Sequence, residues 1–383
     1  MTAACGAAGG REIFDTATLL AGIRRWVECE SPSTDAAAVN RMVDLVEQDA
    51  LAAKLAVQRF PGRDGYGDHL LVATPQAGSG PGVLVLSHLD TVHPVGALDG
   101  ALPFRVEGDF AYGPGIADMK GGAFLGFTAL RHLVAQQSPT PLPIRQLFVS
   151  DEEVGSPTSR ALIEAEAARA KFVLVTEPAR QGGKVVTARK GTALFKLHIK
   201  GRPAHSGTGH QDGRSAVSEL ARQILALNAL TDYASGVTVN VGVVAGGTRA
   251  NIVPAEAHAE IDMRLPTPEL ADEMIAKALG LMAHDPDVTL TVTGGLNRPP
   301  YIKSPGIESL FDHACRLAAQ IGFALEDLAT SGASDGNFTA ASAPTLDGLG
   351  VDGVGAHTSQ ERLYISSLVP RCRLLLRLME TLR

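Results

Sequence analysis

The stretch of residues 82–90, GVLVLSHLD, decides the fold class, because a continuous apolar run ends directly in His88 and Asp90. Such uninterrupted Val and Leu runs are typical of parallel strands buried on both faces. Three further segments carry acidic residues: IRQLFVSDEE carries Asp151, Glu152 and Glu153, KFVLVTEP carries Glu177, and the glycine-rich loop GPGIADMKGG carries Asp118. Ligands of open α/β sheets gather at the carboxyl ends of the strands. We therefore predict one crevice with several carboxylates, which repel one another and need cations.

The composition excludes some classes of function. The 383 residues include 34 basic and 41 acidic side chains, a net charge of −7, which attracts neither nucleic acid nor an anionic membrane. No apolar run reaches transmembrane length, and the N-terminus lacks a secretory pattern. The four cysteines form no CxxC motif, which is typical of a reducing compartment. We expect a soluble, cytoplasmic protein of two domains.

The pattern along the chain predicts an α/β domain with a second domain inserted into it. Strand and helix patterns alternate before residue 190 and again after 300, which indicates a sheet covered by helices on both faces. Between 191 and 299 the strands alternate apolar and polar residues, with helices near 213–229 and 268–283, in the order βαββαβ. We predict a catalytic domain of residues 1–190 and 300–383 and an inserted, ferredoxin-like α+β domain of residues 191–299.

Each candidate motif is weak when taken alone. His88-Leu89-Asp90 places two side chains on one face of a strand end, where an aspartate can orient an imidazole, but a buried histidine beside a helix-capping aspartate explains the motif as well. The loop around Asp118 does not fit a phosphate loop, because an acid stands where the dinucleotide fingerprint has its third glycine.

Glu152 and Glu153 are adjacent, so on an extended backbone they point in opposite directions. One can bind a metal while the other exchanges protons with water, as metal-assisted hydrolysis requires. A solvated acidic turn is the alternative.

Five candidate ligands offer nitrogen and oxygen atoms and no thiolate. They are His88, Asp118, Glu153, Glu177 and His357. This donor set suits Zn²⁺, Co²⁺ or Mn²⁺, and one carboxylate that bridges two ions would make a two-metal hydrolytic centre.

Several motifs then occur together and in order along nearly the whole chain. They are SHLDTV, GPGIADMKGG, SDEEVGS, VTEP, GRPAHSG, NIVPAEAHAEIDMR and GVGAHT. In this the chain resembles the zinc-dependent metallopeptidase family of glutamate carboxypeptidase, acetylornithine deacetylase, succinyl-diaminopimelate desuccinylase and aminoacylase. Residues 330–358 look most like the glutamate carboxypeptidase branch. The resemblance implies a zinc-exopeptidase-like mixed sheet flanked by helices.

The resemblance also implies roles for the catalytic-domain residues. His88, Asp118 and Glu177 would bind one zinc, and Asp118, Glu153 and His357 the other, with Asp118 as the bridge. Asp90 would orient His88, and Glu152 would be the general base that deprotonates the bridging water, to give a metal-bound hydroxide, and later protonates the leaving amine. A cis peptide is expected between Asp118 and Met119.

In this family the inserted domain supplies further site residues. His205 in GRPAHSG would stabilise the oxyanion, in its own subunit or in the partner's. Asn251 and Arg264 would contact the terminal carboxylate of the substrate, since a guanidinium pairs with a carboxylate through two hydrogen bonds. A structural histidine and a surface arginine are the alternatives at these positions.

We therefore predict a dizinc hydrolase that releases a C-terminal amino acid such as glutamate from a small peptide or N-acyl amino acid. N-acyl amino acid deacylation, of the acetylornithine or succinyl-diaminopimelate type, is the second possibility. A catalytically silent metal-binding homologue is the third. The exposed sheet edges expected of the insert favour a homodimer through that domain.

Overall fold

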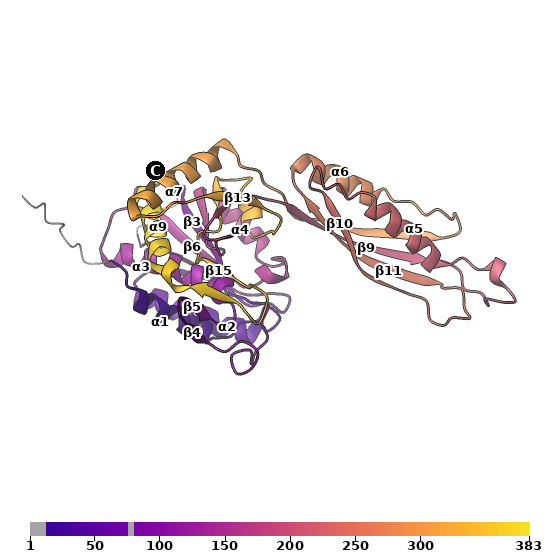
Figure 1. The fold of residues 1–383 in the computed structure, drawn as a ribbon, viewed down its shortest axis with the longest axis horizontal. Coiled ribbons are helices and arrows are strands. Elements are labelled where there is room, and N and C mark those ends of the chain that lie inside the picture. The colour runs from indigo at the N-terminus through magenta and orange to yellow at the C-terminus, as the bar shows by residue number, and fades with distance from the viewer. Residues whose placement is uncertain (1–12, 76–79) are drawn as a thin grey trace, which may run out of the picture. The chain divides into compact units, whose positions relative to one another are not determined.

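The computed structural model describes residues 13–75 and 80–383, and the internal contacts of the chain divide it into two compact units (Figure 1). The first unit contains the described residues up to Val185, together with Ser309–Asp327 and Thr345–Arg383. The second contains Val186–Glu308 and Leu328–Pro344. The predicted domains differ from these units at their ends and at residues 328–344.

A six-stranded sheet forms the centre of the first unit, in the order β1-β2-β6-β3-β7-β14. Its strands are β1 (Ala56–Phe60), β2 (His69–Ala73), β3 (Gly82–His88), β6 (Ile144–Val149), β7 (Ala170–Val175) and β14 (Thr345–Leu346). β3 runs parallel to β6 and β7, and β7 runs parallel to β14, whereas β1 and β2 are joined antiparallel at one edge. Every residue of β3 and β6 is buried. The predicted mixed sheet with buried parallel strands is confirmed.

Helices flank this sheet (Figure 1). They are α1 (Thr16–Val27), α2 (Ala36–Ala52), α3 (Gly121–Ala135), α4 (Arg160–Ala168), α7 (Pro305–Ile321) and α9 (Leu368–Thr381). α3 is buried along residues 121–130 and lies against β3 and β6 on one side and against α1 and α9 on the other. A helix that is apolar on all sides belongs in a core. The N-terminus of α3 therefore has a firmly held position directly after the Asp118 loop.

A second, small sheet joins distant segments of the first unit. Its order is β15-β16-β5-β4, with β4 (Arg105–Glu107), β5 (Phe110–Tyr112), β15 (Gly353–Val354) and β16 (Arg362–Tyr364). β16 pairs antiparallel with β5, and Arg362 lies opposite Tyr112. This pairing brings the turn between β15 and β16, which carries His357, next to the loop that follows β5, which carries Asp118.

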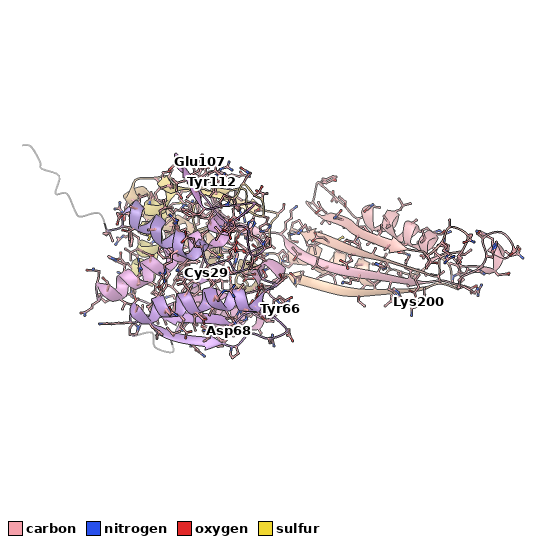
Figure 2. All side chains as sticks on the ribbon, turned by 90° about the horizontal axis from the view of Figure 1, so that it is seen from below. Cys29, Tyr66, Asp68, Glu107, Tyr112 and Lys200 are labelled. Carbon is pink, nitrogen blue, oxygen red and sulfur yellow. The ribbon has the colours of Figure 1, made fainter. Side chains whose placement is uncertain are left out.

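The second unit has the predicted order βαββαβ. It consists of β9 (Gly191–Lys200), α5 (Ala216–Asn228), β10 (Thr238–Gly246), β11 (Glu256–Leu265), α6 (Pro268–Leu279) and β12 (Thr289–Arg298). The sheet order is β10-β11-β9-β12, so β10 and β12 are the edges. Along β9 buried and exposed residues alternate from Ala193 to Lys200, which Figure 2 labels, and both helices contact the sheet. The described elements also include a two-stranded pair, β8 (Val185–Arg189) with β13 (Asp327–Thr330), the short α8 (Gly336–Thr339), and the turns η3 (His210–Asp212) and η4 (Ile365–Ser367).

Two expectations concern the chain as a whole. Among residues 13–75 and 80–383, no helix has both the length and the apolar character needed to cross a bilayer. Cys29, Cys315 and Cys372 take part in no disulfide among the described residues, and Cys5 lies outside them.

Candidate metal centre

Three parallel strands bring candidate metal ligands together at their carboxyl ends. His88 is the last residue of β3 and lies opposite Val149, the last residue of β6. Glu152 and Glu153 follow β6 in a short turn, η2 (Glu152–Val154), and Glu177 follows the end of β7. The carboxyl ends of parallel strands meet at one edge. Side chains from separate parts of the sequence therefore face one another there.

Asp118 enters this group from an irregular turn, η1 (Ile116–Lys120), between β5 and α3. Asp118 and Met119 have non-helical backbone angles, and the peptide bond between them is cis, as expected. Gly115 has a φ of 69°, and a Cβ on it would lie 2.4 Å from Thr91 Cγ2. The turn thus requires glycine there for both conformation and space.

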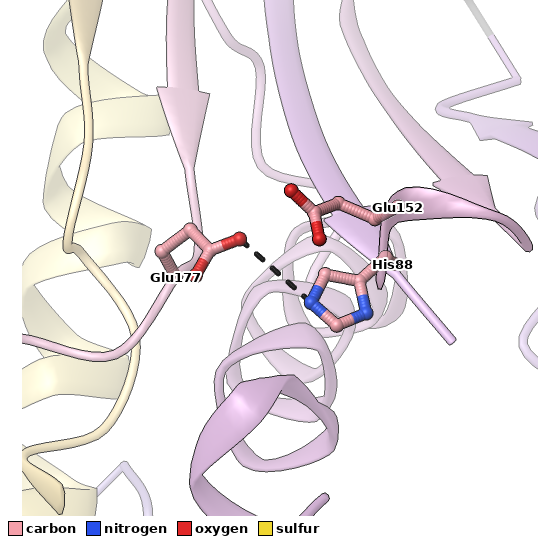
Figure 3. A group of neighbouring side chains, drawn as sticks. All are labelled: His88, Glu152 and Glu177. Atoms are coloured by element: carbon pink, nitrogen blue, oxygen red, sulfur yellow. Dashed lines mark ion pairs between the residues drawn. The ribbon is translucent and has the colours of Figure 1, made fainter. Parts of the chain in front are cut away.

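The carboxylates converge on two imidazoles. His88 Nε2 lies 3.2 Å from Asp118 Oδ1 and 3.7 Å from Glu177 Oε1. His357 Nε2 lies 3.4 Å from Asp118 Oδ2 and 3.0 Å from Glu153 Oε2. The two oxygens of Asp118 thus face two different imidazoles. In Figure 3 the side chains of His88, Glu152 and Glu177 point toward one another, with the His88–Glu177 pair dashed.

The described residues contain two groups of three potential ligands, and within each group the ligand atoms lie within 4.8 Å of one another. One group is His88, Glu152 and Glu177, and the other is His88, Asp118 and Glu153. Together they contain four of the five predicted ligands and the predicted base. The fifth ligand, His357, joins them through its contacts with Asp118 and Glu153.

The ring of His88 is oriented by the backbone as well as by a carboxylate. His88 Nδ1 lies 2.9 Å from the main-chain oxygen of Asp90 and 3.5 Å from its Oδ1. The carbonyl can only accept, so Nδ1 carries a hydrogen. In the protonated ring Nε2–H donates to Asp118, and in the neutral ring Nε2 has the lone pair that a metal ion would bind.

The carboxylate of Asp90 mainly holds the turn that follows β6. Its Oδ1 accepts the N–H of Glu152 at 3.2 Å, and its Oδ2 accepts the N–H of Glu153 at 3.1 Å. Ser33 Oγ donates to Oδ2 at 2.6 Å. Asp90 is fully buried. It therefore fixes the backbone position of both glutamates.

The electrostatics show a surplus of negative charge. Burial raises the pKa of Glu177, and the carboxylates of Asp118 and Glu152 raise it further, to well above the usual range. Burial lowers the pKa of His88, but its hydrogen bonds with Asp118 and Asp90 outweigh this and raise the pKa well above 6.5. Hydrogen bonds with Asp118 and Glu153 raise the pKa of His357 to about 10. Protons on the two imidazoles thus compensate charges that divalent cations would neutralise.

The donor atoms fit divalent metal ions. Glu153 Oε1 is buried and has no hydrogen-bond partner, an arrangement that is costly unless a cation coordinates it. The surrounding donors are carboxylate oxygens and imidazole nitrogens, which suit Zn²⁺, Co²⁺ and Mn²⁺.

A cavity of about 250 Å³ lies beside the metal-ligand cluster. Its lining comprises Pro94, Ala97, Leu102, His357 and Thr358, among others. A larger hollow of about 1340 Å³ is lined by residues such as Phe14 and Pro143, and Pro143 immediately precedes β6. This hollow therefore lies at the amino ends of the parallel strands, away from the candidate ligands at their carboxyl ends.

The other three predicted site residues belong to the second unit. His205 is exposed, and its Nδ1 accepts the N–H groups of Gly207 at 3.1 Å and Thr208 at 3.2 Å. The backbone oxygen of Asn251 accepts the N–H of Ser206 at 3.1 Å. Arg264 donates to both oxygens of Asp262, at 2.7 and 3.1 Å.

Two residues near the ligands were not foreseen from the sequence. Ser33 binds Asp90, and Glu361 accepts the N–H of Asp118 at 3.0 Å. Ser33 stands between α1 and α2, far in the sequence from Asp90, and Glu361 stands four residues after His357. Closeness in sequence to a predicted ligand is a signal for Glu361 alone.

Comparison with known proteins establishes the family. The model of peptidase family M20/M25/M40 matches residues 84–381. The chain belongs to peptidase family M20/M25/M40. Carboxypeptidase G2 of Pseudomonas sp. (strain RS-16) is 34% identical over 299 residues, which cover 76% of this chain and 71% of that protein. A probable carboxypeptidase of Trichophyton verrucosum (strain HKI 0517) is 31% identical over 252 residues, 60% of this chain and 54% of that protein.

Solved structures show the same fold. Aminopeptidase PepT from Bacillus cereus ATCC 10987 has a TM-score of 0.76 at 23% identity, over 96% of this chain and 99% of that chain. The M20 family metallo-carboxypeptidase Sso-CP2 from Sulfolobus solfataricus has a TM-score of 0.74 at 16% identity, over 94% of this chain and 98% of that chain. The resemblance inferred from the motifs is confirmed. This member of family M20/M25/M40 is a metallohydrolase that acts on peptide or amide bonds.

Proposed function

We propose that this protein is a dizinc carboxypeptidase that releases a C-terminal amino acid, such as glutamate, from a small peptide or N-acyl amino acid. The observation that carries the proposal is the position of Glu152, whose carboxylate lies among those of the ligand group while its backbone is held by Asp90. The likeness to carboxypeptidase G2 supports the carboxypeptidase branch.

In this proposal His88, Asp118 and Glu177 hold one zinc ion, and Asp118, Glu153 and His357 hold the other. Co²⁺ and Mn²⁺ suit the same donors. The bound ions supply Lewis-acid polarisation of the scissile carbonyl and of the attacking water. Asp118 Oδ1 faces His88 and Asp118 Oδ2 faces His357. This arrangement supports Asp118 as the ligand shared by both ions.

Glu152 carries the proton in this reaction. It takes a proton from the water as the carbon–oxygen bond forms, and it delivers that proton to the amine nitrogen as the carbon–nitrogen bond breaks. The products are a carboxylic acid and an amine, and the acid then gives its proton to the amine or to solvent and becomes a carboxylate. The two hydrogen bonds from the backbone of Glu152 and Glu153 to Asp90 keep the base in place through both transfers.

The second unit would complete the site. Because Nδ1 of His205 accepts two backbone N–H groups, the neutral ring carries its hydrogen on Nε2, which can donate to the developing oxyanion. Asn251 and Arg264 would bind the substrate's terminal carboxylate, for which Arg264 would have to exchange or share its partner Asp262.

We also propose a homodimer through the second unit. β10 is an edge strand, and Val243 and Val244 on it are 51% and 54% exposed. On α5, which contacts β10, Leu225 is 72% exposed. An unpaired edge flanked by apolar side chains is suited to pairing with a second copy.

The central test is amine release from peptidyl-glutamate, N-acetylornithine and N-succinyl-diaminopimelate by zinc-loaded wild type and Glu152→Gln. We expect release from peptidyl-glutamate, and a kcat that falls roughly 10²- to 10⁴-fold in the variant, with two zinc ions retained. Glu164→Gln, which changes an exposed glutamate on α4, is the matched control. A Glu152→Gln protein with full activity, or one that loses a zinc ion, contradicts the assignment of Glu152 as the base.

The dimer is tested by sedimentation velocity of wild type, Leu225→Asp and Met282→Asp. Met282 is 81% exposed and follows α6, which contacts the opposite edge strand β12, so its change serves as the control. We expect Leu225→Asp alone to be monomeric. If the monomer is also inactive, His205 acts in the partner's site; a wild type that is monomeric at all concentrations refutes the dimer.

A further inference from the structure

Glu361 is a buried carboxylate that binds the Asp118 turn through backbone N–H groups. Its side chain has no exposed surface. Oε1 accepts the N–H groups of Ala117 at 2.9 Å and Asp118 at 3.0 Å. Oε2 accepts the N–H of Gly115 at 3.1 Å and lies 2.6 Å from His93 Nε2. Four partners around one carboxylate offset the cost of burying its charge.

These bonds satisfy N–H groups for which a helix has no acceptor. The turn η1 begins at Ile116, and the N–H groups at the start of a helical turn have no partner within it, so they need acceptors from elsewhere. Glu361 supplies acceptors for three of them. Both oxygens are engaged by donors, which leaves Glu361 poorly placed to coordinate a metal ion itself.

The main chain of Glu361 belongs to the turn that carries His357. Its N–H donates to the oxygen of Thr358 at 3.2 Å, and its own oxygen accepts the N–H of Gly113 at 3.4 Å. Within this turn His357 has a φ of 64°, in the left-handed region that non-glycine residues seldom adopt. One residue thus ties the Asp118 turn to the His357 turn.

We propose that Glu361 is a positioning residue that fixes the distance between Asp118 and His357 and so preassembles one of the two metal sites. The inference rests on the proposed two-metal centre. His88 and Glu177 are held by the ends of β3 and β7, without contact with Glu361. Loss of Glu361 therefore weakens binding of one ion more than binding of the other. The affected ion is the one held by Asp118, Glu153 and His357, and the other is held by His88, Asp118 and Glu177.

The test is stepwise binding of Co²⁺ to metal-free protein, followed by calorimetry and by the visible spectrum of the bound ion. Each carboxylate oxygen of Glu361 accepts at least one backbone N–H. In Glu361→Gln one of these oxygens becomes an NH₂ group, which cannot accept, so a backbone N–H loses its acceptor. We expect one ion to bind within about threefold of wild type and the other roughly 10- to 100-fold more weakly, the usual cost of losing an outer partner of a metal ligand.

Glu219→Gln is the matched control. Glu219 is buried in the second unit, where its Oε1 accepts the N–H of His284 at 3.0 Å and binds the Gln223 amide at 2.7 Å. The same chemical change there should leave both Co²⁺ affinities unaltered. His93→Ala removes one partner of Glu361 but leaves both of its acceptor oxygens. We expect a smaller loss of affinity for the ion held by Asp118, Glu153 and His357.

The outcomes are distinct. If wild type binds fewer than two ions, the proposed two-metal centre fails. If wild type binds two ions and folded Glu361→Gln binds both as wild type does, or loses both affinities equally, the positioning role is refuted. If Glu361→Gln does not fold, His93→Ala decides: selective weakening of one ion supports the role, and two unchanged affinities overturn it.

Discussion

Replacing Asp90 with asparagine tests whether this carboxylate holds the Glu152 turn. Oδ1 accepts the N–H of Glu152, and Oδ2 accepts the N–H of Glu153 and the hydroxyl of Ser33. The hydroxyl can reverse and accept, but a backbone N–H cannot. Whichever oxygen becomes NH₂, one backbone N–H is therefore left facing a donor.

The expected cost follows from these contacts. A buried N–H without an acceptor costs about 1–3 kcal/mol, and the remaining bonds lose the extra ~1 kcal/mol that a charged acceptor provides. Removal of a buried charge offsets part of this loss. We expect the free energy of unfolding of the first unit to fall by about 2–3 kcal/mol. Because the base moves with its backbone, kcat should fall roughly 10- to 100-fold.

Trp26 makes the measurement specific to the first unit. It is the single tryptophan of the chain, it is fully buried, and its ring centroid lies 5.1 Å from that of Phe124. Its fluorescence during urea unfolding reports this unit alone. Asp151→Asn is the matched control, because its Oδ1 binds only the hydroxyl of Ser159, which can accept from the new amide. Equal stability and equal kcat for Asp90→Asn and wild type would refute the reasoning.

Two further predictions concern pH and packing. In metal-free protein the pKa of His357 is raised from 6.5 to about 10, so its stabilising effect is complete below pH 6.5 and is lost as the pH rises toward 10. A metal ligand is a neutral imidazole, so the difference in Tm between zinc-loaded and metal-free protein should widen from pH 6.5 to 10; a constant difference would contradict this. At Gly122 a Cβ would lie 2.0 Å from the oxygen of Thr176, so Gly122→Ala should lower stability by about 3 kcal/mol and displace Glu177, measured by urea unfolding and zinc affinity. Gly126→Ala, whose nearest contact is the Gln146 side chain at 3.0 Å, should cost less, and equal losses would argue against the packing explanation.

Much of the candidate ligand set was recognisable in the sequence. The runs that end in His88, Glu152 and Glu177 are long and uniformly apolar, and these are the features that identify buried parallel strands. Asp118 and His357 are different, because neither follows such a run. They were candidates because of their donor atoms, and their assignment to particular ions depended on the resemblance to a family.

Several contacts were not predictable. The strands β4, β5, β15 and β16 contain two or three residues each, too few to show a period. The sequence also suggested that the Asp90 carboxylate orients His88, whereas its backbone oxygen makes the shorter contact. A side-chain contact with a backbone N–H leaves no trace in the residue types, so Glu361 could not be assigned.

The sequence by itself determined the α/β class, the βαββαβ insert and the residue types able to bind metal ions, because strand period, helix period and donor chemistry are local properties. Only the tertiary structure decided that the turn of His357 meets the turn of Asp118. At that meeting β16 pairs with β5, and Glu361 accepts the N–H groups of residues 115, 117 and 118. Pairing between segments so far apart in the chain is set by the whole packed unit, and no short window of sequence contains it.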